Sequence, residues 1–376
     1  MPKKVAIVRC DTYNVEDVKC ALEKGINLLG FEFPAFNRVL LKPNLLMKKS
    51  LEEAVTTHPS VVEAVIRIIQ EKANEIIIAD SPGGPYTKRR LEAIYQAAGL
   101  KDLESYKKVI LNYDTSFKEV QLKKSILKKI SFISPYFEAD GLINLPKLKT
   151  HRMAVYTGAV KNLFGLVPGG QKAELHFRLQ EVEKFMEMLL DIYYTANPVL
   201  NIMDAIVGME GEGPSAGKPR SLGLILISQD AVALDFVACK IIGLQTKDVP
   251  LLNVAKTKGL LDPDDIEIVG EKLEEVAVGN FDVPLRPEIS FVRGRAPNFV
   301  SRFINDLLTP RPVFNRDVCI GCAECFNACP AQAIEMRSRK AYVDLEKCIR
   351  CYCCHELCPA KAITIRRSFL FEKILK

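Results

Sequence analysis

Hydrophobic and polar positions over residues 1–283 alternate between short apolar runs and stretches with helical periodicity. The apolar runs predict strands at Lys4–Arg9, Arg38–Lys42, Glu75–Ala79, Gly141–Leu145, Val199–Met203 and Ser221–Ser228. The helical stretches predict helices at Val15–Leu29, from Ser60 onward, at Lys88–Ala98 and at Ala231–Ile242. Strands separated by helices of this length indicate βαβ crossovers. The predicted fold class is therefore α/β, with a mainly parallel sheet and helices on both faces.

Polar residues in front of three of these helices predict where the helices begin. Asn14 precedes the first helix and Asp230 precedes the last, and both residue types are good N-caps. Ser60 and Glu63 have the spacing of a capping box, so we expect Ser60 to cap the second helix.

Two loops after predicted strands combine small residues with polar side chains. Ligands of open α/β sheets bind beyond the carboxyl ends of the strands, so these loops are candidate binding sites. Lys42 and Asn44 end the second strand, whereas Asp80, Ser81 and Gly83 follow the third. Small residues let a ligand approach the backbone closely. A plain turn is the alternative interpretation of both loops.

A glycine-rich segment carries two of the four histidines, His151 and His176, with Lys161 and Asn162 between them. Histidine acts as acid, base or metal ligand near neutral pH. Lysine can contact phosphate or act as a nucleophile. We interpret His151, Lys161 and His176 as candidate catalytic residues and Asn162 as a candidate cofactor contact. A single histidine in such a segment would more often be structural.

A charged loop is expected between Asp204 and Arg220. Its carboxylates Asp204, Glu210 and Glu212 could hold a divalent metal, and its glycines could expose N–H groups to an anion. A solvated loop explains the same residues. Pro219 stands where a P-loop needs Ser or Thr, and no G-x-G-x-x-G occurs, so neither standard nucleotide motif is present.

Two cysteine runs near the C-terminus share the spacing C-x2-C-x2-C-x3-C-P. In two-cluster ferredoxins, three thiolates of each run bind one 4Fe–4S cluster and the fourth binds the other cluster. The first cluster is assigned to Cys319, Cys322, Cys325 and Cys358. The second is assigned to Cys348, Cys351, Cys354 and Cys329. Zinc sites use two pairs of ligands, so the spacing predicts two 4Fe–4S clusters and electron transfer. Cys353 lies beside Cys354 and could compete for iron, but it is interpreted as a bystander.

The same patterns divide the chain into four segments. They are an α/β domain at 1–283, a Pro- and Arg-rich connector at 284–316, a two-cluster ferredoxin domain at 317–367 and a basic amphipathic tail at 368–376. The cysteines cluster instead of scattering as a disulfide framework, which favours a reducing cytoplasm. There is no apolar run of transmembrane length and no secretory signal.

The formal charge of +6 changes once the clusters are counted. Each oxidised cluster with four thiolates carries about −2, which leaves a net charge of about +2. A dispersed excess of this size does not indicate a nucleic acid partner. The expected partners are a redox protein and a small anionic substrate.

Four motifs resemble a known family, catalogued as domain of unknown function 362 and often fused to a two-cluster ferredoxin. They are Lys42–Asn44, Thr56–Pro59, Tyr156–Gly165 and Asp204–Gly217. The resemblance covers roughly residues 1–280. The family has no established activity, so the resemblance implies a fold and not a reaction.

The segment from Gly158 to His176 is also similar to part of the nickel-dependent lactate racemases. The resemblance implies that Lys161 carries a nickel-pincer nucleotide, that His176 binds nickel and that His151 is an acid–base group. The chain departs from that family at Ala159, where the racemases have glycine. It also lacks their Gly-Thr-His motif after a strand.

These observations favour a redox enzyme whose clusters exchange electrons with a substrate, or with an unidentified ligand, in the α/β domain. One alternative is a non-enzymatic electron-transfer subunit of a larger complex. Another is a racemase-like enzyme with a metal cofactor attached to lysine.

Overall fold

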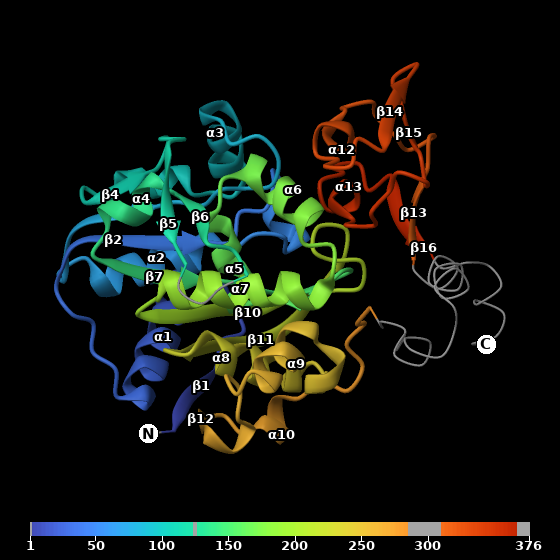
Figure 1. The fold of residues 1–376 in the computed structure, drawn as a ribbon. Helices are drawn as coiled ribbons and strands as arrows, with labels where there is room; N and C mark the ends of the chain where they lie inside the picture. The colour runs from blue at the N-terminus through green and yellow to red at the C-terminus, as the bar shows by residue number, and fades with distance from the viewer. Residues whose placement is uncertain (1, 123–125, 285–309, 367–376) are drawn as a thin grey trace.

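The computed structural model describes residues 2–122, 126–284 and 310–366. The predicted tail and most of the predicted connector lie outside the described residues. Within the described residues the chain forms a large α/β domain and a small cysteine-rich module, which are the blue-to-gold and the orange-to-red parts of Figure 1.

The large domain is built on a 10-stranded sheet. Its strands are β1 (Lys3–Arg9), β2 (Phe36–Pro43), β3 (Ala73–Ile78), β4 (Val109–Leu111), β7 (Gly141–Leu145), β8 (Lys147–His151), β9 (Val155–Thr157), β10 (Leu200–Glu210), β11 (Lys218–Ser228) and β12 (Ile266–Gly270). The main path runs β12-β1-β11-β10-β7-β2-β3-β4, and β8 pairs with β10 and β9. Along this path only the two pairings of β11 are antiparallel. The predicted mainly parallel sheet is therefore confirmed.

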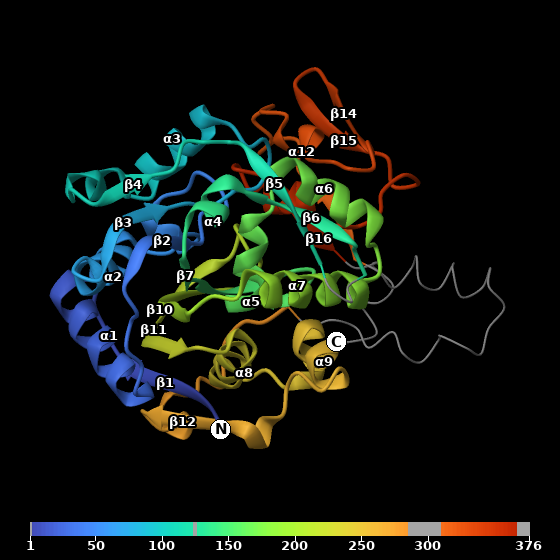
Figure 2. The same cartoon turned by 60° about the vertical axis from the view of Figure 1, so that its left-hand side comes forward.

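Helices cover both faces of this sheet (Figure 2). One face packs against α1 (Val15–Leu29), α2 (Pro59–Ile69) and α3 (Lys88–Ala97). The other packs against α5 (Ala159–Asn162), α7 (Val182–Ala196), α8 (Ala231–Ile241) and α9 (Pro250–Thr257). Strand β1 illustrates the two layers, since Val5 and Ile7 belong to one core and Ala6 and Val8 to the other. Burial on both faces explains its continuous apolar run.

Shorter elements complete the α/β domain. They are β5 (Phe117–Gln121), β6 (Lys129–Ile133), α4 (Ser134–Glu138), α6 (Gly169–Arg178) and α10 (Leu273–Val276). Helix α6 lies next to the cysteine-rich module in both overall views (Figures 1 and 2).

Two of the three predicted helix caps are confirmed. The Asn14 side chain accepts hydrogen bonds from the first turn of α1, and the Asp230 side chain accepts one from the first turn of α8. The predicted capping box is wrong, because α2 begins at Pro59 and its N-cap is His58. The imidazole Nδ1 of His58 accepts the N–H of Ser60. Glu63 instead binds Arg67.

The charged loop predicted from Asp204 to Arg220 is mostly a β-hairpin. Strand β10 continues through Glu210, which lies opposite Lys218 in β11. Opposite charges on facing strands stabilise such a ribbon, which explains why charged residues continue the strands here. Only residues 211–217 form the turn between them.

The described part of the cysteine-rich module consists of two antiparallel strand pairs and two short helices. Its elements are β13 (Arg311–Phe314), α12 (Glu324–Asn327), β14 (Ile334–Arg337), β15 (Lys340–Val343), α13 (Cys353–Glu356) and β16 (Ile363–Arg366). Strand β13 pairs with β16, so residues placed in the connector by the sequence pattern form part of the module. None of the helices that the structure describes is long and apolar enough to cross a bilayer.

Candidate functional site

A cavity of about 350 Å³ lies between the α/β domain and the cysteine-rich module. The loops after β2 and β3 line one side of it, as expected for ligand sites at the carboxyl ends of parallel strands. The predicted site residues that line it are Asn44, Asp80, Ser81, Gly83, Lys161, Asn162 and His176. Helix α13 of the module contributes Cys353 and Glu356 to the opposite side. The cavity is therefore shared by both parts of the chain.

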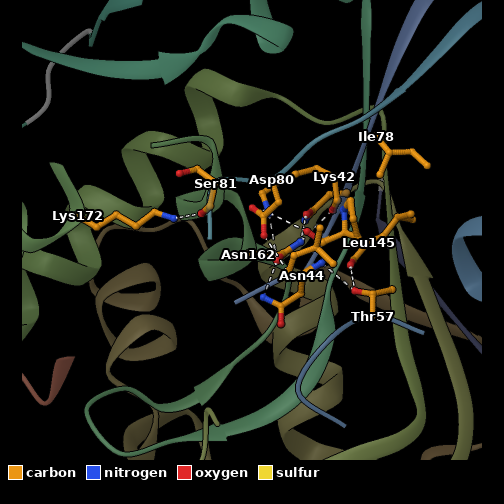
Figure 3. A network of polar contacts seen from close by, with 12 residues as sticks. Lys42, Asn44, Thr57, Ile78, Asp80, Ser81, Leu145, Asn162 and Lys172 are labelled. Atoms are coloured by element: carbon orange, nitrogen blue, oxygen red, sulfur yellow. Dashed lines mark hydrogen bonds and ion pairs between the residues drawn. The ribbon is translucent and has the colours of Figure 1, made fainter. Parts of the chain in front are cut away.

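A buried ion pair joins the two strand-end loops. The Lys42 Nζ lies 2.7 Å from the Asp80 Oδ1, and the other carboxylate oxygen accepts the N–H of Leu45 at 2.9 Å. Figure 3 shows these side chains converging on Asn162 of α5. Burial lowers the pKa of Lys42, whereas the charge of Asp80 opposes that shift. Lys42 thus packs behind the cavity wall, where it holds Asp80, and does not itself line the cavity.

Gly165 makes this arrangement possible. A Cβ atom at this position would lie 1.9 Å from the Asp80 Oδ1 and 2.4 Å from the Lys42 Nζ. The backbone after α5 can therefore pack directly on the ion pair only because residue 165 has no side chain.

Two asparagines connect the ion pair to a lysine that sequence reasoning missed. The Asn44 Nδ2 donates to the Asn162 Oδ1 at 3.1 Å, and the Asn44 Oδ1 accepts from the Lys149 Nζ at 2.6 Å. Lys149 lies on β8 and lines the cavity. The sequence pattern that could have identified Lys149 is its spacing of two residues from Lys147. Both lysines follow directly after the predicted strand Gly141–Leu145, so both would lie near the end of that strand.

Helix α5 is held in place by Asp235 of α8, another residue that the sequence did not single out. Its carboxylate accepts the N–H groups of Ala159 and Val160 at 2.6 and 3.0 Å and the hydroxyl of Tyr156 at 3.0 Å. A Cβ atom on Gly158 would lie 2.2 Å from this carboxylate. The glycine therefore lets Asp235 cap α5, which carries Lys161 to the cavity.

Three lysines line the cavity: Lys149, Lys161 and Lys172. Burial lowers the pKa of Lys149 and of Lys172 to about 7, and the nearby charge of Lys161 lowers both further. Lys172 donates to the backbone oxygen of Ser81, as Figure 3 shows. At neutral pH the Nζ atoms of Lys149 and Lys172 can therefore bind or release a proton.

The two candidate histidines lie in different environments. His151 is buried behind the cavity, with its Nε2 3.1 Å from the Glu356 Oε1. Its Nδ1 accepts the N–H groups of Met153 and Ala154, so the ring proton must reside on Nε2. Burial lowers the pKa of His151 to about 4. His151 is thus a neutral link to the module and does not face the cavity.

His176 lines the cavity from α6. Its ring stacks on Phe185 at a centroid distance of 4.4 Å. Burial lowers the pKa of His176 to about 4, so its imidazole is neutral at pH 7. It can act there as a hydrogen-bond partner for a ligand.

The three carboxylates predicted for a divalent metal do not converge. Asp204 is buried in β10 and pairs with Lys147 at 2.8 Å. Glu210 accepts the N–H of Asp282 at 3.1 Å, and Glu212 pairs with Arg152. In the described part of the chain, no three His, Cys, Asp or Glu side chains are placed to hold a single metal ion.

The predicted cluster cysteines are grouped in two small cavities of the module. One is lined by Cys319, Cys322, Cys325 and Cys358. The other is lined by Cys329, Cys348, Cys351 and Cys354. The fourth cysteine of each run therefore lies with the first three of the other run, as the spacing predicts.

Cys353 connects the second of these cavities to the large cavity, because its side chain lines both. It is buried and is not one of the predicted ligands. Whether Cys353 is a bystander to iron binding stays a prediction, but the structure places it between the two cavities.

Hydrogen bonds hold the module over the cavity. The Ser215 hydroxyl donates to the backbone oxygen of Glu356 at 2.6 Å, and the Lys49 Nζ donates to that of Pro359 at 3.3 Å. Arg90 pairs with Glu324 at 3.0 Å. These contacts keep α13 against the α/β domain.

Comparisons with known proteins agree with this division of the chain. A family model described as "Domain of unknown function (DUF362)" matches residues 39–240, and one described as "4Fe-4S dicluster domain" matches residues 311–359. A thylakoid-associated protein of Synechocystis sp. is 32% identical over 327 residues, which are 82% of this chain and 98% of the relative.

Two solved structures show weaker similarity. The lactate racemase apoprotein from Thermoanaerobacterium thermosaccharolyticum has a TM-score of 0.41 and 14% identity, and the match covers 63% of this chain and 56% of the racemase. A protein from Thermotoga maritima has a TM-score of 0.38 and 12% identity, with coverage of 60% and 57%. The chain thus spans little more than half the length of each structure.

Proposed function

The chain belongs to the DUF362 family and carries a 4Fe–4S dicluster domain of the ferredoxin type, and from this premise we propose that it is an iron–sulfur redox enzyme. The ferredoxin-type domain supports iron–sulfur electron transfer. Our proposal adds two clusters, bound by the two groups of four cysteines. It also adds a small anionic substrate bound in the large cavity.

The position of Cys353 carries this proposal. A ligand in the large cavity would lie across one side chain from the four cysteines proposed to bind the second cluster. Electron transfer needs such proximity between the two redox centres. Placing both on one chain also gives them a high effective concentration.

The cysteine group proposed to bind the first cluster lies near the protein surface, where a redox partner can approach. Cys322 is exposed, and the neighbouring Ile320 and Val318 are 61% and 45% exposed. A redox partner protein could contact these apolar side chains next to the first cluster. Electrons would then pass between the partner and the cavity through the first and second clusters in turn.

The cavity side chains support proton exchange during such a reaction. When bound, the clusters supply one-electron chemistry. Lys149 and Lys172 can hold or release a proton near neutral pH, since the pKa of each is about 7. Lys161 and the neutral His176 line the cavity, which supports a role for both in binding and orienting the substrate.

A reoxidation experiment tests this function. The anaerobic holoprotein is reduced and mixed with the low-molecular-mass fraction of an anaerobic cell extract, and cluster reoxidation is followed by stopped-flow absorbance. We expect this fraction to accelerate reoxidation of the wild type. We expect His176→Ala and Lys161→Ala to reduce the acceleration by about tenfold or more.

An artificial dye and Lys240→Ala serve as controls. The dye can reach the exposed cysteine loop, so all variants should reduce it at the wild-type rate. Lys240 is exposed at the end of α8 and should not affect either reaction. Equal acceleration in the wild type and both cavity variants would instead favour a non-enzymatic electron-transfer subunit. We expect a reducing compartment such as the cytoplasm for a protein of this kind.

A further inference from the structure

The large cavity has an excess of positive charge on its wall. Among the described residues, none of Lys149, Lys161 and Lys172 forms an ion pair. No described carboxylate oxygen therefore lies within 4 Å of their Nζ atoms. Two carboxylates also line the cavity. Asp80 is neutralised by Lys42, whereas Glu356 faces the neutral His151 and keeps its negative charge. The wall therefore carries three lysines against one uncompensated carboxylate.

Lys149 is the most constrained of the three. It is only 1% exposed, and its ammonium donates to the Asn44 Oδ1 and to the backbone oxygen of Val55. Both acceptors are neutral. A buried charge without a counter-charge is costly, so an anion in the cavity would stabilise the charged form of this lysine.

Neutral hydrogen-bond donors lie on the same wall. Helix α6 begins at the cavity with Gly169 and Gly170, and no side chain caps its N-terminus. Ser81 also lines the cavity, and its hydroxyl is buried and has no hydrogen-bond partner in the part of the chain that the structure describes. Free N–H groups at a helix N-terminus, combined with an unpaired hydroxyl, favour an anion.

We propose that the cavity binds a phosphorylated small molecule, with its phosphate group held by the three lysines, the Ser81 hydroxyl and the N-terminus of α6. This inference rests on the proposed function, because it names the class of the substrate or cofactor at the same site.

Three features favour phosphate over carboxylate. A phosphate group carries up to two charges and three acceptor oxygens, which suits several donors arriving from different directions. Lysine binds such a group as a point charge. A planar carboxylate is better matched by the fork of arginine, and no described residue lining this cavity is an arginine.

Calorimetric titration of the anaerobic holoprotein with inorganic phosphate tests the site. We expect phosphate to bind the wild type, and acetate to bind at least about tenfold more weakly. Lys172→Gln and Ser81→Ala should each weaken phosphate binding, the lysine variant by about tenfold or more. Lys161→Gln is a second charge variant that breaks no ion pair in the described chain. Lys240→Gln is the matched control and should bind phosphate like the wild type.

Phosphate binding that is absent, or equal in all variants, would overturn the inference. Preferential binding of acetate would do the same. Phosphorus NMR of the ligand released from purified protein distinguishes a phosphate ester from free phosphate, and we expect the ester. The reoxidation test is independent of this result. If phosphate binds as expected but the cavity variants reoxidise normally, the proposed function fails and the binding site stands.

Discussion

Lysines in and behind the cavity wall have two different roles. Lys42 is neutralised by Asp80 and holds two loops together. Lys149 and Lys172 have no carboxylate partner among the described residues, and their pKa of about 7 follows from burial. The same side-chain type therefore serves as a structural counter-ion at one position and as a candidate ligand contact at two others.

The first prediction concerns pH. An anion raises the pKa of Lys149 and Lys172 above their ligand-free values of about 7, so binding takes up protons. The two lysines favour phosphate most below pH 7, where both are protonated, so affinity should fall by about tenfold or more between pH 7 and pH 9. Calorimetry in buffers of different ionisation enthalpy measures the proton uptake. An affinity that is unchanged over this range would contradict the assignment of these lysines.

The second prediction concerns Gly165. In Gly165→Ala the new Cβ atom would overlap the Lys42–Asp80 pair, so we expect a loss of about 3 kcal/mol in the free energy of unfolding. Gly279→Ala is the matched control, because Gly279 is exposed and a Cβ atom there would contact nothing within 4 Å. Its stability should change by less than about 0.5 kcal/mol. Denaturant unfolding compares the two variants.

Short elements around the cavity depend on long-range contacts. Helix α5 has four residues and could not be stable alone, because helix nucleation costs more than one turn recovers. Asp235 stabilises it from α8. Helix α13 is equally short and is held against the α/β domain by the contact between Ser215 and Glu356.

The third prediction follows from the cap on α5. Asp235→Ala would leave two N–H groups and the Tyr156 hydroxyl without their acceptor, at a cost of about 2–4 kcal/mol in unfolding free energy. Asp264→Ala, on the exposed surface, should change stability by less than about 0.5 kcal/mol. Similar unfolding midpoints for the two variants would show that Asp235 does not hold the helix.

Across the molecule as a whole, the two cysteine groups differ in their surroundings. The group containing Cys322 lies at an exposed loop, whereas the group containing Cys354 is separated from the large cavity by Cys353. This arrangement predicts different roles for the two clusters. The first would exchange electrons with a partner and the second with the cavity.

The fourth prediction tests these roles. Cys322→Ala should lose or convert the first cluster and slow dye reduction, while the large domain stays folded. Cys354→Ala should alter the second cluster and abolish reoxidation by the cavity ligand. Iron analysis and EPR spectra report the clusters, and circular dichroism reports the fold. Wild-type iron content and spectra in both variants would refute the ligand assignment.

Local patterns predicted six strands and four helices of the α/β domain but missed other elements, among them α7, α9 and β8. The strand Gly141–Leu145 and the helix Val15–Leu29 have the predicted bounds, because burial and capping there are local properties of the sequence. The capping box at Ser60 failed because His58 supplies an acceptor first. The hairpin of β10 and β11 was mistaken for a loop, since pairing with a partner strand is not visible in the charge pattern of one segment.

The sequence alone determined the alternation of strands and helices, the cysteine spacing and seven of the residues that line the cavity. These features are set by residues that are close together in the sequence, so local sequence patterns are enough to predict them. Only the tertiary structure decided that Lys149 lines the cavity, that His151 lies behind it and that Cys353 joins it to a cysteine group. These facts depend on which distant segments pack together and on which charges lose water in doing so, and neither is set by local sequence.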